Sequence, residues 1–341
     1  MRSSKWNAGD AVIFCDSELR RLKIAVTGGR GFLGRYVVDA LVSHGASPEN
    51  IIAPLRTEFD LRSAHDAAAV VADRDLVIHL AARVGGIGFN QCWPADLIYD
   101  NTMMGLNVIE QARKKGVQKL LVAGTVCAYP KFASVPFKEV DLWNGYPEET
   151  NAPYGLAKRH MLVMLQAYRQ QHNLHGVFLL PANLYGPHDN FDVETSHVIP
   201  AMIRKFVEAK NDRMPAVELW GDGSPSREFL FIEDCARAFV LAALRYDGPE
   251  PINLGTSEET NIRFLAETIR ELTGYQGEIV WNSSRPNGQA KRQLDVSRAK
   301  EAFGFEAKVA LKDGLQKTIS WYLEHQEVGV SRATGDPTSL F

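Results

Sequence analysis

A tyrosine and a lysine stand four residues apart at Tyr154 and Lys158, in the stretch Tyr-Gly-Leu-Ala-Lys. Because four residues make about one helical turn, both side chains lie on one face of the helix that we predict at 153–172. A free phenol loses its proton near pH ~10, and a neighbouring cation favours the phenolate. We therefore expect Lys158 to lower the pKa of Tyr154, so that the phenol exchanges a proton with a carbonyl oxygen near neutral pH.

A glycine-rich loop precedes this pair, between a short apolar run at 23–27 and a predicted helix at 32–44. Its GxxGxxG pattern permits a tight turn, close approach of the backbone to a pyrophosphate and close packing of helix on strand. A plain turn is the alternative, but the place of the loop after the first predicted strand favours a dinucleotide. The cofactor contacts expected here are Gly28, Arg30, Gly31, Phe32, Leu33 and Gly34.

The second predicted strand lies at 51–54. The charge of the side chain that follows it indicates which dinucleotide binds. An acid there would hold the ribose 2′-hydroxyl of NAD, whereas an arginine suits the 2′-phosphate of NADP. The chain has Arg56 in this place, and the nearest acid, Asp60, comes several residues late. A solvated loop arginine is the alternative reading of Arg56. With Arg30 as a second cation, we predict NADP(H) as the cofactor.

Five short, almost wholly apolar runs indicate the strands of a parallel sheet, because strands covered on both faces have this composition. They lie at 23–27, 51–54, 76–80, 120–123 and 177–180, and the helical stretches between them include 95–115 and 153–172. This alternation predicts an α/β chain with a doubly wound (Rossmann) parallel sheet.

The pattern changes beyond residue 180, where glycine and proline interrupt the chain at 183–190 and 221–225. Strands near 217–220 and 279–281 are short, and segments near 226–256 are expected to return to the main sheet. We predict a poorly ordered N-terminal extension at 1–22 that docks on the surface. A cofactor-binding Rossmann domain at 23–180 and a smaller C-terminal α/β substrate lobe at 181–330 should follow it.

The composition is that of a soluble globular protein, with 45% apolar and 23% charged residues among 341. A net charge of −3 gives no reason to expect nucleic acid or a membrane as partner, and no apolar run approaches the ~18 residues of a membrane span. The four cysteines form no CxxC pair, which suits the reducing cytoplasm. His188 and His197 have no third ligand at a recognisable spacing, so we expect no metal.

Several longer motifs resemble those of the extended short-chain dehydrogenases/reductases, and within them the branch that makes GDP-L-fucose. The motifs are Gly85-Gly86-Ile87, Cys127-Ala128-Tyr129-Pro130, Asn183-Leu184-Tyr185-Gly186-Pro187-His188-Asp189-Asn190-Phe191 and Ser196-His197-Val198-Ile199-Pro200. Members of this branch convert GDP-4-keto-6-deoxy-D-mannose by 3,5-epimerisation and NADPH-dependent 4-reduction. The resemblance, from about residue 23 to 326, implies this activity, a GDP-sugar substrate and a homodimer formed through the helices at 95–115 and 153–172.

The same resemblance implies catalytic roles. Cys127 corresponds to the base and His197 to the acid that together invert carbons next to the keto group, chemistry for which a thiol and an imidazole titrate in a suitable range. Tyr154 then protonates the sugar O4, Thr125 binds the keto oxygen, and Lys158 holds the nicotinamide ribose. Taken without the resemblance, a lone cysteine after a strand is more often a small core residue, and the histidine more often structural.

The remaining site residues also come from the resemblance. Arg227 corresponds to an arginine that binds the substrate pyrophosphate, and Lys205 replaces an arginine, which keeps the charge but loses the bidentate fork. Trp220 either stacks on the base or packs. The substrate set is Asn183, Lys205, Trp220, Arg227, Lys291, Arg292 and Asp295, and the further cofactor set is Ala81, Ala82, Lys158, Pro181, Asn183, Leu184 and His197.

Two other functions stay open at this point. One is a related reductase or epimerase for another nucleotide-linked 4-keto sugar, such as a heptose or a dideoxyhexose. The presence of both Cys127 and His197 favours an enzyme that epimerises. The other is a catalytically silent NADP sensor, in which loss of Tyr154 or Lys158 would be expected, yet both are present.

Overall fold

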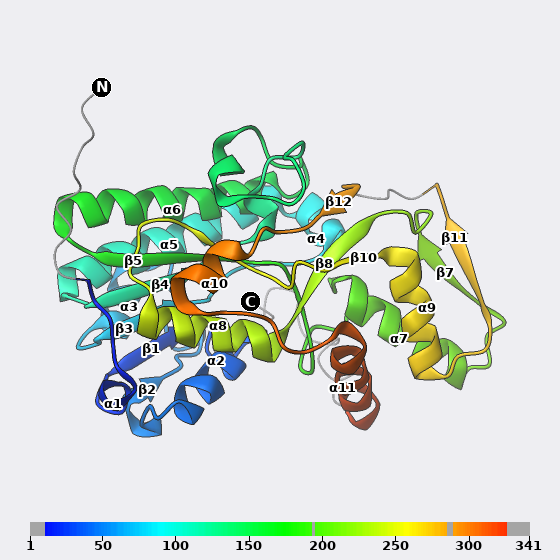
Figure 1. The fold of residues 1–341 in the computed structure, drawn as a ribbon, viewed down its shortest axis with the longest axis horizontal. Helices are drawn as coiled ribbons and strands as arrows, with labels where there is room; N and C mark the ends of the chain where they lie inside the picture. Colours follow the sequence, from blue (N-terminus) through cyan, green and yellow to red (C-terminus); the bar gives the residue numbers. More distant parts are fainter. Residues whose placement is uncertain (1–10, 193–194, 285–288, 326–341) are drawn as a thin grey trace.

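A six-stranded parallel sheet is the largest layer of the computed structural model, which describes residues 11–192, 195–284 and 289–325 (Figure 1). The strand order is β2-β1-β3-β4-β5-β9. The strands are β1 (Ile24–Thr27), β2 (Ile51–Ile52), β3 (Leu76–His79), β4 (Lys119–Ala123), β5 (His175–Pro181) and β9 (Ile252–Leu254). All residues of β1, β3, β4 and β5 are buried because helices cover both faces of the sheet. The expected doubly wound fold and its first five strands are confirmed.

Helices form a layer on each side of this sheet. On one side α2 (Phe32–Ser43) packs against α8 (Ile232–Arg245); on the other, α5 (Pro94–Lys115) packs between α3 (Ala64–Val71) and α6 (Ala152–His172) (Figure 1). The α5 helix ends at Gly116, whose φ of 70° requires glycine or a similarly tolerant residue. Three basic residues in its last turn interact favourably with the negative end of the helix dipole and stabilise the helix.

A second group of elements lies at the carboxyl end of the main sheet, on the right of Figure 1. Its central strand, β8 (Ser226–Phe231), pairs antiparallel with β10 (Glu259–Asn261) and parallel with β6 (Asn183–Tyr185) and β12 (Lys291–Arg292). The other elements there are β7 (Ala216–Trp220), β11 (Glu278–Asn282), α7 (Val198–Asn211), α9 (Ile262–Thr273) and α11 (Leu311–Glu324). Strands β7 and β11, both expected from the sequence, form a separate parallel pair.

Short elements complete the described chain. They are α1 (Asp16–Leu19), α4 (Ile87–Cys92), α10 (Ser297–Phe303) and the 3-10 turns η1 (Pro48–Asn50), η2 (Val126–Ala128) and η3 (Glu139–Trp143). Of these, η2 and α4 follow the carboxyl ends of β4 and β3, where ligands bind in open α/β sheets.

Two hydrophobic cores accompany the two groups of elements. One surrounds the main sheet, and the other includes Phe206, Phe231, Leu265 and Leu315. The chain crosses between them more than once, since β9 adds to the edge of the main sheet at β5 and α8 packs on α2. We therefore propose a Rossmann domain at 23–180 with returning segments near 226–256, and a substrate lobe at 181–330, of which residues 326–330 lie outside the described chain.

The segment just before β1 is better ordered than we expected. Phe14 and Leu19 are buried in the main core. The backbone of Val12 is held at both polar atoms: its N–H donates to Asp247 at 2.8 Å, and its carbonyl accepts from Lys119 Nζ at 2.8 Å. Residues 12–22 are thus part of the folded domain, which corrects the expectation of a poorly ordered extension. Residues 1–10 lie outside the described chain.

Candidate active site

The turn after β4 fixes the candidate base. Thr125 caps η2, and its Oγ1 accepts a hydrogen bond from the Cys127 backbone N–H at 3.1 Å. This bond sets the backbone that carries the thiol, and Cys127 itself is half-buried. The hydroxyl and the thiol therefore lie together at the carboxyl end of the main sheet, as expected for the catalytic residues.

Helix α6 brings the tyrosine and the lysine to this turn. A Cβ at Gly155 would lie 2.5 Å from the Cys127 carbonyl oxygen, so the glycine allows the helix to approach η2 closely. Tyr154 and Lys158 are both buried, and the Lys158 Nζ lies 5.7 Å from the centre of the Tyr154 ring. The predicted one-turn spacing thus places the ammonium over the phenol, and Gly155 places both beside Cys127.

The expected effect of Lys158 on Tyr154 is wrong. Burial raises the pKa of the Tyr154 phenol, and the nearby Cys127 adds to the rise. Burial also lowers the pKa of Lys158 to about 8, so the lysine remains charged at neutral pH. Removal of both groups from water outweighs their mutual attraction. Tyr154 is therefore a protonated acid at neutral pH, which is the form that donates to a carbonyl oxygen.

The glycine loop fits a dinucleotide. A Cβ at Gly34 would collide with the Gly28 carbonyl oxygen, so the first turn of α2 packs directly on the loop. The Arg30 side chain donates from Nε to the Ala53 carbonyl at 3.1 Å, which holds it at the end of β2. A shallow pocket between these elements is lined by Gly29, Arg30, Arg35, Val38, Asp39 and Ala53. The second cation there, Arg35, is absent from our sequence prediction, while Arg56 lies on the exposed turn after β2.

The other residues expected at the cofactor also lie at strand ends. Ala81 and Ala82 follow β3, Pro181 ends β5, and Asn183 and Leu184 belong to β6. Asn183 donates from Nδ2 to the Glu228 carbonyl at 2.9 Å, which links this wall to β8. Parallel strands place their carboxyl ends at one edge, and the set therefore lies along the edge where the glycine loop begins.

Two arginines approach the thiol from the second sheet. Strands β8 and β12 pair so that Arg227 stands opposite Arg292. Arg292 Nη1 lies 3.5 Å from Cys127 Sγ. Arg227 is close enough to interact electrostatically with Cys127, and burial, together with Arg292, lowers its pKa to about 10, so it stays charged at neutral pH. The structure thus brings two of the expected substrate residues to the candidate base.

The remaining expected substrate residues are less directly placed. Lys205 donates to the Glu218 carbonyl at 3.0 Å, and Lys291 is exposed, 3.6 Å from Glu259. Trp220 ends β7 with 53% of its surface exposed. Asp295 accepts from the backbone N–H and the hydroxyl of Ser297, at the start of α10. Their roles at the substrate stay predictions.

The candidate acid, His197, caps the N-terminus of α7. Its side chain is exposed, yet the protein around it still removes enough water to lower its pKa, so we treat it as a neutral imidazole at pH 7. The preceding residue lies against the loop after β3, because a Cβ at Gly86 would be 2.7 Å from the Ser196 carbonyl oxygen. The Ser-His-Val-Ile-Pro motif and the Gly-Gly-Ile motif therefore meet, as residues of one site must.

A polar chain beside Tyr154 is absent from the sequence prediction. Glu148 accepts from Thr150 and Asn151, and Asn151 in turn accepts from Asn90 Nδ2 at 3.2 Å. Burial opposes ionisation of Glu148, but these hydrogen bonds and the charge of Arg292 hold its pKa below the usual range. The available signal was the spacing, since Glu148, Asn151 and Tyr154 recur at three-residue intervals into α6.

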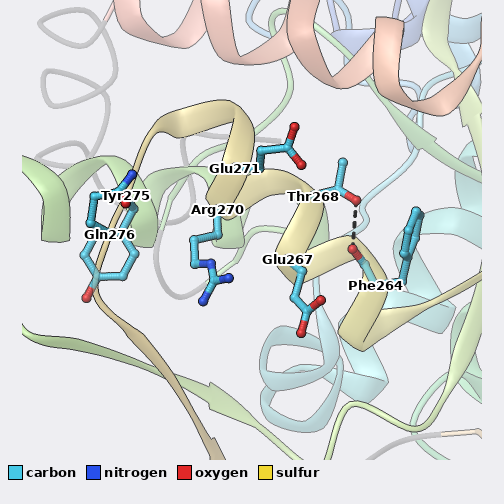
Figure 2. Close-up of a pocket in the computed structure, with 7 residues that line it drawn as sticks. All are labelled: Phe264, Glu267, Thr268, Arg270, Glu271, Tyr275 and Gln276. Atoms are coloured by element: carbon cyan, nitrogen blue, oxygen red, sulfur yellow. Dashed lines mark hydrogen bonds between the residues drawn. The ribbon is translucent and has the colours of Figure 1, made fainter.

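A hollow elsewhere on the surface has a different character. Figure 2 shows a pocket formed by residues of α9 with Tyr275 and Gln276 after it. Its described lining is mostly charged or polar and contains no residue predicted for cofactor or substrate. Within the described ranges, no group of three potential ligands could hold a metal ion, and no helix has the length and apolar character to cross a bilayer.

The class of this protein follows from the glycine loop, the Tyr-Lys pair and the parallel sheet together. The model of the NAD dependent epimerase/dehydratase family matches residues 24–255. The chain belongs to the NAD dependent epimerase/dehydratase family.

Individual relatives narrow the comparison and bear out the expected resemblance. The chain is 43% identical over 306 residues to the probable GDP-L-fucose synthase 1 of Oryza sativa subsp. japonica, covering 89% of this chain and 92% of the relative. A GDP-L-fucose synthetase from Naegleria fowleri bound to NADP superposes with a TM-score of 0.82 at 27% identity, covering 94% and 98%. A GDP-6-OMe-4-keto-L-xylo-heptose reductase from C. jejuni has a TM-score of 0.84 at 29% identity, covering 89% and 98%.

Proposed function

We propose that this protein is an NADPH-dependent epimerase and reductase that makes GDP-L-fucose from GDP-4-keto-6-deoxy-D-mannose. The observation that carries the proposal is the meeting of Cys127 with the Tyr154 helix on one side and Arg292 on the other. A reductase needs the tyrosine and lysine, whereas a base beside them suits inversion of the carbons that flank the keto group. The 43% identity to a probable GDP-L-fucose synthase supports the same substrate.

The epimerisation follows from the placement of these groups. Cys127 as thiolate takes a proton from the carbon next to the keto group, and the electron pair moves to the keto oxygen. The Tyr154 hydroxyl and Thr125 hydroxyl donate to that oxygen and stabilise the enolate. His197 returns a proton to the opposite face of the carbon. Because the pKa of His197 is lowered, the proton that it returns comes from the minor protonated fraction at pH 7, and that imidazolium gives up its proton more readily than a free one.

The reduction uses the same tyrosine. NADPH supplies the hydride to C4 when it is bound. Tyr154 gives its proton to O4, and the Lys158 ammonium stabilises the phenolate that results. The residues that would hold NADPH are the glycine loop with Arg30 at its adenosine end, and Lys158, Pro181, Asn183 and Leu184 at its nicotinamide end. The close packing at Gly34 and the NADP bound by the Naegleria fowleri relative support this assignment.

The second sheet is the proposed substrate wall. Arg227 is a half-buried cation suited to one phosphate of the GDP group, with Lys291, Lys205 and Trp220 further out. Asn90 supports a sugar site near η2, since it is buried and its Oδ1 has no hydrogen-bond partner among the described residues. A sugar hydroxyl would satisfy such an atom.

The runner-up is a reductase for another GDP-linked 4-keto sugar. The heptose reductase from C. jejuni shares the fold at 29% identity, and such a reductase would use the same tyrosine, lysine and glycine loop. Cys127 beside Arg292 favours an enzyme that also epimerises.

We also propose a homodimer in the cytoplasm. Helices α5 and α6 pack on each other and still expose apolar residues such as Ile98, Tyr99 and Val163, which a second copy would cover. The free cysteines suit a reducing compartment.

One incubation tests the proposed function. The protein, NADPH and GDP-4-keto-6-deoxy-D-mannose in deuterated water should consume NADPH and yield GDP-L-fucose with deuterium at C3 and C5. Reduction without deuterium at these carbons would identify a plain reductase, and no loss of NADPH absorbance would refute the proposal.

A further inference from the structure

Arg292 contacts the candidate base itself, although the sequence suggested a contact with substrate. We infer that the Arg292 guanidinium is a positioning residue that holds Cys127 in its thiolate form before substrate arrives. The inference deepens the proposed function, on which the role of Cys127 as base rests. In this inference the partner of Arg292 is the Cys127 thiol and not the substrate diphosphate.

The guanidinium has little freedom to turn elsewhere. Arg292 is 8% exposed and belongs to β12, whose pairing with β8 fixes its backbone. Its Nε donates to Gln289 Oε1 at 2.7 Å, and Gln289 Nε2 donates to the Lys131 carbonyl at 2.9 Å. Because the guanidinium is a rigid plane, this anchor directs Nη1 at Cys127 Sγ, 3.5 Å away.

The chemistry of the pair favours the thiolate. A guanidinium has donors alone, so a sulfur that faces it serves best as an acceptor, and the thiolate is the stronger acceptor. The backbone that carries the sulfur is held as well, through the Thr125 hydrogen bond to the Cys127 N–H and the close packing of Gly155 on the Cys127 carbonyl. The thiol therefore meets the arginine without needing a substrate to bring them together.

The charges around the sulfur favour its ionised form. Arg227 of β8, Arg292 of β12 and Lys158 of α6 contribute three positive charges, and Glu148, before α6, contributes one negative charge. Tyr154 of α6 also faces Cys127 but is neutral, because burial raises its pKa. The excess charge is positive, and a thiolate reduces it. The thiol proton leaves to water, and the sulfur can then take a carbon-bound proton while that electron pair moves to the keto oxygen.

Alkylation of Cys127 tests the inference without any sugar. In a Cys15→Ser/Cys92→Ser background, iodoacetamide at pH 7 is followed by mass spectrometry of the peptide that contains Cys127. Since the thiolate is the reactive form and a nearby opposite charge shifts such an equilibrium by at least about tenfold, Arg292→Gln should slow alkylation about tenfold. Lys300→Gln, which removes an exposed charge on α10, is the matched control and should alkylate at the parental rate.

A conservative variant covers the case in which Arg292→Gln does not fold. Arg292→Lys keeps the charge without the fork, and it should slow alkylation by a smaller factor, about threefold. If both variants fold and alkylate at the parental rate, the inference is overturned.

Turnover separates the two assignments of Arg292. A positioning residue for the base lowers kcat and deuterium incorporation, whereas a diphosphate ligand raises KM for the GDP-sugar. A tenfold rise in KM with unchanged alkylation would return Arg292 to the substrate and refute the inference. Slower alkylation in a protein that never consumes NADPH with the GDP-sugar would support the Arg292–Cys127 pair and refute the proposed function, so the two failures are distinct.

Discussion

At the scale of single residues, burial shifts the pKa values of the Tyr-Lys pair more than neighbouring charges do. Lys158 has a pKa lowered to about 8 by burial, and Tyr154 has a raised pKa for the same reason. The raised pKa keeps the phenol protonated, and the lowered pKa of Lys158 still lies above neutral pH, so the ammonium persists there. The pair is therefore set to deliver a proton, and this direction of transfer suits reduction of a ketone.

The lowered pKa of Lys158 predicts that activity falls and stability rises as pH increases above neutral. As pH rises through about 8 the ammonium loses its proton, so kcat for NADPH oxidation should fall. The unfolded lysine keeps its proton up to about pH 10.4, so the unfolded state binds more protons between these values and the free energy of unfolding should rise. Lys158→Met should abolish both trends. A kcat profile with thermal melts at each pH checks this, and a joint loss of activity and stability would contradict it.

Cys127 carries the second prediction at this scale. Cys127→Ser should lower deuterium incorporation at C3 and C5 by at least about a hundredfold, because general base catalysis contributes about 10²–10⁴. Binding of NADPH should be unchanged, since the glycine loop and α6 are not altered. The measurement is nuclear magnetic resonance of the product, with Cys15→Ser, far from η2 in the sequence and exposed, as the control. Parental exchange in Cys127→Ser would show that another group is the base.

At the scale of elements, the site is an assembly of strand ends and one helix. The carboxyl ends of β3, β4 and β5 present the proposed cofactor wall, α6 presents the Tyr-Lys pair, and the β8–β12 pair presents the arginines. Helix α6 approaches η2 closely at Gly155, which faces the Cys127 carbonyl. The distance between helix and turn therefore sets the distance between phenol and thiol.

Gly155→Ala tests that approach. In a helix the change would ordinarily stabilise by about 1 kcal/mol, but here a Cβ would lie 2.5 Å from a backbone oxygen. We expect the reverse sign, a loss of about 1–3 kcal/mol of unfolding free energy, and at least a tenfold drop in kcat as α6 moves away from η2. Urea unfolding and NADPH oxidation measure the two effects. A variant as stable and as active as the parent would show that the contact relaxes without consequence.

At the scale of the whole molecule, the chain crosses between the two cores. The N-terminal segment packs against the amino end of the main sheet and closes it there. Lys119 donates to the Val12 and Ala243 carbonyls, and Phe14 packs in the same core with its ring 5.7 Å from the Lys119 Nζ. The site is at the carboxyl end of the strands, whereas this closure lies at their amino end, where β4 begins. The two regions should consequently respond to mutation independently.

Phe14→Ala tests the closure. Removing a buried aromatic side chain should cost about 3 kcal/mol of unfolding free energy, while kcat at temperatures below the transition stays at the parental value. Ile13→Ala is the matched control, because Ile13 is 48% exposed and its loss should change stability by less than about 0.5 kcal/mol. Equal effects of the two substitutions in urea unfolding would mean that residues 12–14 do not belong to the core.

The sequence alone determined the features that are local in the chain. The apolar runs predicted β1, β3, β4 and β5, because strands buried on both faces are mostly apolar. The glycine spacing predicted the loop before α2, and the one-turn spacing of Tyr154 and Lys158 predicted a shared face of α6. Motifs quoted for the resemblance led to the family that the comparisons confirm.

Tertiary structure decided what depends on contacts between distant segments. The pairing of β8 with β12 brings Arg292 to Cys127 across 165 positions of sequence, and no spacing rule relates two such residues. Burial reversed the expected pKa of Tyr154, because the water removed from a side chain depends on every element around it. Ordering of residues 12–22 likewise depends on Lys119 and Asp247, partners that lie more than a hundred positions away.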